Sequence, residues 1–223
     1  MKSPIPIYAV VTESHRALLE DWFLKYLPDD CIPTIAILKA APVSFRSGHW
    51  HKIFIHKLQL VLQAIERHSG EIISISDVDI QFFRTFADEV CTLIEGYDIL
   101  FQNSKPEGPE ILTQLCAGFS IVRCGPVAAE FFKEALRLVE EKNDPSFDDQ
   151  VAFQSMCSGP TKAKVGLLPN TYWTCGKMWF PDMPLDLPEN IALHHAAWIV
   201  GNGGKVIQLE KARAIVEARN HRL

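Results

Sequence analysis

Short apolar runs alternate with longer amphipathic stretches along most of this sequence. The apolar runs predict buried strands at residues 5–11, 32–38, 72–75, 97–102 and 119–122. Apolar residues at helical spacing predict helices at residues 15–26, 49–67, 127–141 and 147–156. This alternation predicts an α/β fold with a mostly parallel central sheet flanked by helices. Ligands of such sheets bind beyond the carboxyl ends of the strands, so the strand exits after residues 11, 75 and 101 are the first places to examine.

The composition fits one globular domain spanning residues 1–223. Hydrophobic residues make up 48% and charged residues 22%, and no repeat or linker divides the chain. A formal net charge of −5 argues against a protein that mainly binds nucleic acid. No apolar run is long enough to span a membrane, and the first is too short for a signal peptide. The six cysteines form no C-x-x-C pair, which favours reduced thiols and a cytoplasmic protein.

The most informative segment is an acidic pair that follows the third expected strand. Asp77 and Asp79 are separated by one residue, so in extended backbone their side chains project to the same side. Two like charges at a strand end are costly unless a cation or a cluster of hydrogen-bond donors lies between them. Mg²⁺ and Mn²⁺ prefer oxygen ligands of this kind. The alternative is a solvated turn in which Asp79 caps the following segment.

Two metal-dependent chemistries use an Asp-x-Asp motif. Phosphatases of the haloacid-dehalogenase type place it after their first strand, with the first Asp as nucleophile. Here the motif follows the third expected strand, and no Gly-Asp-x-x-x-Asp motif comes later. Sugar-nucleotide transferases use the motif to hold a metal that bridges a diphosphate. The position therefore favours a transferase, and the phosphatase remains the alternative.

Five segments together resemble the GT-A glycosyltransferases. They are Tyr-Ala-Val-Val-Thr-Glu at 8–13, Ser-Asp-Val-Asp-Ile at 76–80 with two Phe after it, Cys-Ala-Gly-Phe-Ser-Ile-Val-Arg at 116–123, Asp-Asp-Gln at 148–150, and His-Ala-Ala-Trp at 195–198 followed by Gly201 and Lys205. The chain most resembles glycosyltransferase family 77 and, more distantly, family 8. The segments occur in family order over most of the chain. The resemblance implies a GT-A fold, which is Rossmann-like.

The resemblance also implies a metal site and a donor site. His195 would complete the coordination of Mn²⁺ or Mg²⁺ by Asp77 and Asp79, with the adjacent His194 as the competing candidate. Without the resemblance, His195 reads as a core or surface histidine. The sequence at 201–205 reads as a flexible glycine loop that brings a lysine to a diphosphate, or as a plain turn. The implied donor-binding residues are Thr12, Glu13, Lys57, Asp77, Gly118, Phe119, Gly201 and Lys205.

Several of these residues have ordinary structural alternatives. Thr12 is also a good N-cap for the expected helix after it. Lys57 and Arg46 are plausible donor contacts, although each also suits a solvated surface. Gly118 would let the chain pass close to the sugar, with Phe119 forming part of the pocket.

The segment at 148–150 carries the implied catalytic residues. In family 8 relatives an Asp-Gln pair lies against the donor sugar, which here corresponds to Asp149 and Gln150, and Asp148 is an equal candidate for the sugar-binding carboxylate. The resemblance implies retention of anomeric configuration by front-face displacement. Both acids also suit the first turn of a helix, where negative charge is favourable.

The implied partners are a nucleoside-diphosphate sugar, with UDP-sugar as the expected donor, and an acceptor hydroxyl on a glycan or other molecule. The aromatic segment at 172–180 would stack on an acceptor sugar or simply cover the core. Ala197 stands where the family pattern usually has Asn. That departure leaves open a non-catalytic module that binds a sugar nucleotide.

Overall fold

A computed structural model describes residues 3–39, 48–105, 112–199 and 201–221. Its centre is a six-stranded sheet in the order β2-β1-β3-β6-β5-β7. The strands are β1 (Ile5–Thr12), β2 (Cys31–Leu38), β3 (Ile72–Ser76), β5 (Ile99–Asn103), β6 (Leu115–Arg123) and β7 (Val165–Leu167). All neighbours pair in parallel except β6, which is antiparallel to both β3 and β5. Five strands therefore point one way, and the prediction of a mostly parallel α/β sheet is confirmed.

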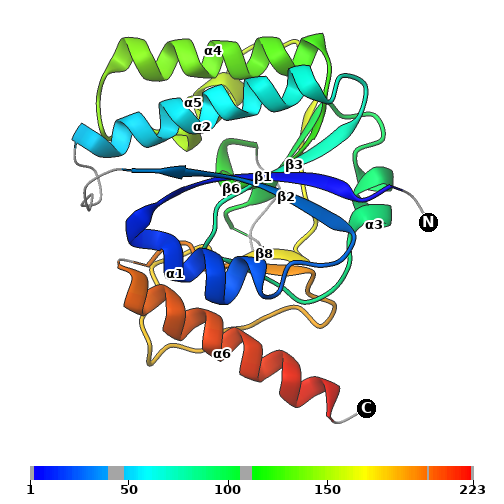
Figure 1. The fold of residues 1–223 in the computed structure, drawn as a ribbon, viewed down its shortest axis with the longest axis vertical. Coiled ribbons are helices and arrows are strands. Elements are labelled where there is room, and N and C mark those ends of the chain that lie inside the picture. The colour runs from blue at the N-terminus through cyan, green and yellow to red at the C-terminus, as the bar shows by residue number, and fades with distance from the viewer. Residues whose placement is uncertain (1–2, 40–47, 106–111, 200, 222–223) are drawn as a thin grey trace.

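Helices cover one face of this sheet, and a second sheet with further helices covers the other. Figure 1 shows α2 (Gly48–Arg67), α4 (Pro126–Lys142) and α5 (Asp149–Cys157) on one side. On the opposite side lie α1 (Arg16–Leu18), α6 (Asn202–Asn220) and a three-stranded sheet in the order β4-β9-β8. The strands of this small sheet are β4 (Ile80–Phe82), β8 (Tyr172–Thr174) and β9 (Leu193–His195), and α3 (Ala87–Leu93) lies at the end of the molecule near the N-terminus (Figure 1).

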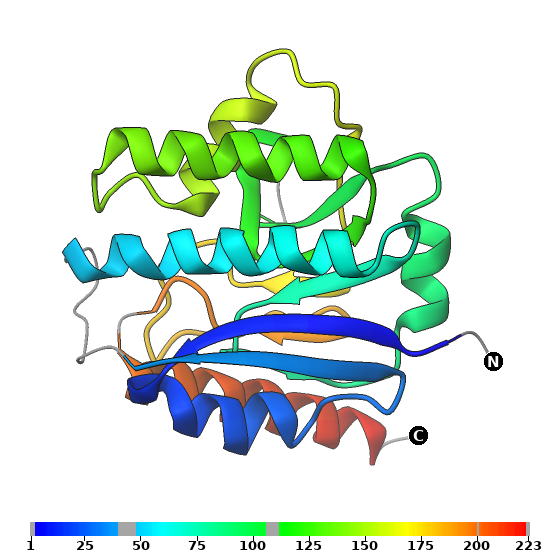
Figure 2. The ribbon, with the colours of Figure 1, turned by 45° about the horizontal axis from the view of Figure 1, so that its top comes forward.

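Strand alternation explains why the central sheet has an apolar core on each face. In β1, Ile7 and Ala9 pack with the α1 side, whereas Tyr8 between them packs with Ile73 and Leu58 on the α2 side. Successive side chains of a strand point to opposite faces, so a sheet buried on both faces needs a continuous apolar run. Figure 2 shows α2 and α4 running side by side across their face.

The structure differs from the expected elements in three places. The segment expected as a helix at 15–26 is helical, but it consists of a 3₁₀ turn (Glu13–His15), then α1, then a π-helical segment (Leu19–Leu24). The expected flexible loop at 201–205 is the beginning of α6, and α3 was not expected at all. Low helix propensity at Gly203 and Gly204 hides the start of α6 in the sequence, but the burial of Leu209 and Ala212 holds the helix in place.

Three further points bear on the earlier expectations. None of the six cysteines, all of which lie in the described ranges, forms a disulfide. Within the described ranges, no helix combines the length and the apolar character needed to cross a membrane. Arg46 lies outside the described residues.

Candidate metal and donor site

The acidic pair lies where the chain passes from the central sheet to the small sheet. Asp77 and Asp79 follow β3, and β4 begins directly after them. The backbone N–H of Asp77 donates to the carbonyl of Gly118 at 2.7 Å, and the carbonyl of Asp79 accepts from Ala196 N–H at 2.9 Å. The Asp79 side chain is buried, whereas that of Asp77 is 39% exposed. One carboxylate is therefore held inside the protein and the other reaches solvent.

Strand pairing in the small sheet brings His195 to these acids. β4 and β9 are antiparallel, with Ile80 opposite His195. The Nε2 atom of His195 lies 3.4 Å from Asp79 Oδ1 and 3.9 Å from Asp77 Oδ2. One oxygen from each acid and one nitrogen from His195 all lie within 4.8 Å of one another. Two carboxylate oxygens and an imidazole nitrogen are ligands that suit Mn²⁺, so the donor set fits a divalent ion.

His194 lies on the other face of the small sheet. Successive residues of a strand point in opposite directions, and the ring of His194 packs 5.1 Å from that of Trp173, its partner on β8. Burial and the neighbouring His195 lower the pKa of His194 to about 3. Of the two adjacent histidines, His195 is the one that faces the acidic pair.

The charges of the buried cluster compensate one another. Burial disfavours the charged form of His195, but Asp79 outweighs it and raises the pKa of His195 to about 10. Burial likewise raises the pKa of Asp79, but Lys205 and His195 outweigh it and hold that pKa well below its usual range. On its far side, His195 Nδ1 lies 3.0 Å from Gln102 Oε1 and 3.6 Å from Cys116 Sγ.

Gly118 makes room for the imidazole of His195. A Cβ atom at position 118 would lie 2.0 Å from Cε1 and 2.5 Å from Nδ1 of His195. Carbon atoms in contact need about 3.5–4.0 Å. The space beside Gly118 is therefore filled by the imidazole of His195, and contact of this glycine with the donor sugar stays a prediction.

The first turns of α6 contribute a cation. Gly201 is the N-cap residue with φ +80°, a conformation that favours glycine, and Lys205 lies in the helix after it. Lys205 Nζ is 2.6 Å from Asp79 Oδ2. The side chain of Asn202 donates to the carbonyl of Ser14 at 2.6 Å, which joins the start of α6 to the exit of β1. Lys205 therefore stands beside the acidic pair, but on a helix and not on a loop.

Lys57 is a buried bridge between two carboxylates and not a surface charge. Its Nζ lies 2.9 Å from Asp77 Oδ1 and 3.0 Å from Asp149 Oδ2, and it donates to the carbonyl of Ala117 at 3.1 Å. Burial alone would lower the pKa of Lys57, but Asp149 and Asp77 outweigh it and raise that pKa. Burial raises the pKa of Asp149 to about 6 despite the pairing with Lys57.

The three residues 148–150 begin α5, next to Lys57. Asp148 is the N-cap, and its Oδ1 accepts from the N–H of Val151 at 2.9 Å. Asp149 Oδ1 accepts from the N–H of Gln150 at 2.9 Å. Gln150 Oε1 accepts from the N–H of Ala117 at 3.3 Å, so this side chain lies against β6 one residue before Gly118. The capping alternative accounts for the observed contact of Asp148.

The exit of β1 lies near the same cluster. Thr12 is buried, and its hydroxyl contacts Ser14 Oγ at 2.9 Å and His15 Nδ1 at 2.8 Å. It therefore does not cap the following helix through its side chain. Glu13 is exposed and pairs with Arg16 at 3.0 Å. Burial and the charge of Lys205 lower the pKa of His15.

Several expected contact residues are core residues. Phe119 is fully buried, stacked on Tyr172 at a ring distance of 5.8 Å, and cannot line a sugar pocket in this structure. Trp173 and Trp179 are also buried, so the acceptor role expected for the aromatic segment at 172–180 is not open to its largest rings. Phe180 alone among the rings of this segment is largely exposed.

The sequence reasoning missed Gln102 and Cys116 as neighbours of the site. A signal for Gln102 was present, because this residue directly follows Phe101 at a strand exit where ligands of α/β sheets are expected. Cys116 begins a segment quoted for the resemblance, but nothing in its local pattern indicates contact with His195. These contacts join residues 79 and 93 positions apart.

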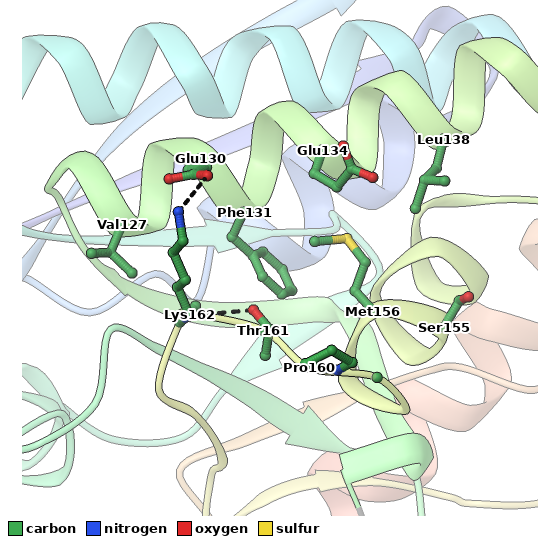
Figure 3. A pocket seen from close by; sticks show the side chains of 12 residues that line it. Val127, Glu130, Phe131, Glu134, Leu138, Ser155, Met156, Pro160, Thr161 and Lys162 are labelled. Atoms are coloured by element: carbon green, nitrogen blue, oxygen red, sulfur yellow. Dashed lines mark hydrogen bonds and ion pairs between the residues drawn. The ribbon is translucent and has the colours of Figure 1, made fainter.

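A separate hollow of about 390 Å³ lies between α4 and residues 155–163 (Figure 3). Its lining is mixed, with apolar side chains such as Phe131 and Met156 and an exposed ion pair between Lys162 and Glu130 at 3.3 Å. Met156 lies near the end of α5, whereas Asp149 begins that helix beside Lys57. The hollow and the metal cluster are therefore at opposite ends of α5.

Solved glycosyltransferase structures share this fold. Among solved structures, the chain is similar to "a glycosyltransferase involved in the glycosylation of the major capsid of PBCV-1". The TM-score is 0.59 at 13% identity, over 93% of this chain and 100% of that one. No family model and no curated protein matches the sequence.

Two further structures have the same fold within longer chains. The glycosyltransferase GlyE of Streptococcus pneumoniae TIGR4 matches with a TM-score of 0.58 at 12% identity, over 93% of this chain and 60% of GlyE. The bifunctional glycosyltransferase WbbM matches with a TM-score of 0.53 at 13% identity, over 88% of this chain and 46% of WbbM. The chain thus spans about half of WbbM and somewhat more of GlyE.

Proposed function

We propose that this protein is a glycosyltransferase that uses a divalent metal ion, Mn²⁺ or Mg²⁺, and a nucleoside-diphosphate sugar, with UDP-sugar as the donor. The observation that carries the proposal is the convergence of Asp77, Asp79 and His195 within 4.8 Å on a glycosyltransferase fold. We propose residues 1–223 as one catalytic domain. When bound, the metal supplies positive charge against the diphosphate that leaves the sugar.

The chain adds its own positive charge beside that position. Lys205 pairs with Asp79 at 2.6 Å, and its side chain is 20% exposed. We propose that Lys205 contacts the donor diphosphate and that Gly201 lets backbone approach it. Thr12 and Glu13, at the exit of β1, would contact the nucleoside. A preorganised cation next to the leaving group stabilises charge that develops in the transition state.

The donor sugar would lie beside the ion pairs that join Asp77 to the start of α5. Lys57 holds Asp77 and Asp149 on either side of one ammonium group, at 2.9 and 3.0 Å. We propose that Asp149 and Gln150, with Asp148 as their helix cap, orient the sugar and that transfer retains anomeric configuration. Because Lys57 already occupies one oxygen of Asp149, this carboxylate would position the sugar and not act as a nucleophile.

The acceptor would be a hydroxyl on a glycan or another molecule. Trp198, three residues after His195, is 40% exposed and has a left-handed backbone with φ +64°. Its carbonyl accepts from the N–H of Trp179 at 3.3 Å, and the exposed side chains of Met178 and Phe180 flank Trp179. Strained backbone that presents an exposed aromatic ring is common at ligand sites. We propose this surface for the acceptor.

Calorimetric titration tests the proposal. UDP and GDP are titrated into the protein with Mn²⁺ and, separately, with EDTA. The expected result is binding of UDP that requires the metal and is lost in Asp79→Ala, with the fold of the variant verified by circular dichroism. Asp79→Ala that retains metal-dependent binding and transfer would refute the proposal.

The same preparation separates the two alternatives. If neither nucleotide binds, hydrolysis of an aryl phosphate that Asp77→Asn abolishes would indicate a phosphatase. Binding of UDP without transfer or hydrolysis of any UDP-sugar would indicate a non-catalytic module.

A further inference from the structure

Gln102 is the buried residue behind His195, on the side away from the acidic pair. It lies on β5, has no exposed surface, and is 93 residues from His195 in the chain. Its Nε2 donates to the carbonyls of Tyr172 and Trp173, each at 3.1 Å. Its Oε1 lies 3.0 Å from His195 Nδ1.

The two carbonyls determine how the Gln102 amide is oriented. A carbonyl oxygen only accepts hydrogen bonds, so the amide group that faces Tyr172 and Trp173 must be the NH₂ donor. The reversed amide would direct Oε1 at two other oxygens and leave all three without a hydrogen. The oxygen of Gln102 therefore faces His195, and His195 Nδ1 must carry a proton to donate to it.

A proton on Nδ1 determines what the other ring nitrogen can do. A neutral imidazole carries one proton, so Nε2 then has a free lone pair. Nε2 is the atom that faces Asp79 Oδ1 at 3.4 Å and Asp77 Oδ2 at 3.9 Å. We infer that Gln102 is a positioning residue that holds His195 in the Nδ1–H tautomer and directs Nε2 at the metal ion.

Cys116 is the other group near Nδ1, and it does not replace Gln102. Its Sγ is 3.6 Å from Nδ1, and a thiol is a weak acceptor. The NH₂ group of Gln102 also donates two hydrogen bonds to β8. β8 pairs with β9, the strand that carries His195. The amide therefore holds a fixed place relative to the histidine.

The inference rests on the proposed metal site, and a Mn²⁺ titration followed by electron paramagnetic resonance tests it. Gln102→Met keeps approximate size but removes the acceptor, and Cys116→Ala is the matched control at the same nitrogen. Loss of an outer partner of a metal-binding histidine typically costs about 10–100-fold in affinity. We expect that loss for Gln102→Met and less than about threefold for Cys116→Ala. Equal affinity of Gln102→Met and wild type would overturn the role of Gln102 while leaving the metal site intact.

A measurement on the wild type covers the case in which Gln102→Met does not fold. Nitrogen-15 spectra of histidine-labelled protein are recorded with Cd²⁺ as a diamagnetic substitute for Mn²⁺, and the His195 signals are assigned by their loss in His195→Gln. The expected spectrum has the proton on Nδ1. A proton on Nε2 would overturn the inference, and a wild type that binds no Mn²⁺ would overturn both it and the metal-dependent function.

Discussion

At the scale of single residues, the site depends on a glycine, which has no side chain, as much as on the charged residues. Gly118 leaves the volume that the His195 ring fills, and its carbonyl accepts from Asp77 N–H at 2.7 Å. One backbone position thus contacts two members of the cluster. This close packing makes Gly118 a sensitive place to perturb the metal site without removing a ligand.

Gly118→Ala is expected to weaken Mn²⁺ binding by about tenfold or more, as loss of an oriented histidine does. The added Cβ would lie 2.0 Å from His195 Cε1, so the ring must move away from the acidic pair. Gly159→Ala is the control, because its Cβ would meet its nearest atom at 3.9 Å. Mn²⁺ titration of both variants measures the effect. Unchanged affinity in Gly118→Ala would mean that the ring position is not what holds the metal.

At the scale of elements, the two faces of the small sheet differ: one faces the acidic pair, and the other packs against α6. His195 on β9 faces the acidic pair, and His194 beside it lies fully buried on the other face, next to Trp173. Gln208 of α6 is also fully buried and lies beside His194. The packing of α6 on this face holds Lys205, one turn before Gln208, at 2.6 Å from Asp79.

The depressed pKa of His194 predicts that stability falls in acid. The unfolded chain takes up this proton near pH 6.5, whereas the folded chain does so only near pH 3. Stability from a neutral buried His194 is therefore complete above pH 6.5 and is lost as the pH falls toward 3, by at most about 1.4 kcal/mol per pH unit.

Urea unfolding in EDTA at pH 7 and pH 5.5 measures this effect. The variant His194→Phe lacks the titrating group. His195, whose raised pKa changes the free energy of unfolding with pH in the opposite direction, is present in both proteins. We expect the wild type to lose about 1 kcal/mol relative to the variant over this interval. The same pH dependence in both proteins would show that His194 is not buried in its neutral form.

At the scale of the whole molecule, the site is where parts of the chain that are far apart in sequence converge. Lys57 comes from α2, Asp77 from the β3–β4 connection and Asp149 from the start of α5, and one ammonium contacts both acids. Figure 1 places α2 and α5 on the same face of the central sheet. The ion pairs therefore join the helical layer to the segment after β3 that carries the acidic pair.

Lys57→Met is expected to lower the free energy of unfolding by about 3–5 kcal/mol, because it leaves Asp149 buried without its cation. Adding Asp149→Asn in the same chain should restore part of that loss, since the amide removes the uncompensated charge. Urea unfolding of the single and double variants at pH 7.5 in EDTA measures both. A loss below about 1 kcal/mol in Lys57→Met would show that water, and not the protein, solvates Asp149.

The order of strands and helices was predictable because burial imposes periodicity on a sequence. The runs at 5–11, 32–38 and 72–75 became β1, β2 and β3 with little change of boundary. Strands of three residues, such as β4, β8 and β9, are too short to show a period. The two glycines at the start of α6 indicate a loop, and only packing against the small sheet makes that segment helical.

Local sequence therefore determined the α/β class, the main elements and the position of the acidic pair at a strand exit. The tertiary structure alone decided that His195 and not His194 meets that pair, that Gly118 makes room for it, and that Phe119 belongs to the core. It also decided that Lys57 is buried between two acids and that Gln102 lies behind the histidine. The physical reason is that hydrophobic periodicity is a local property of the sequence. Each of these contacts instead joins residues that only strand pairing and helix packing bring together.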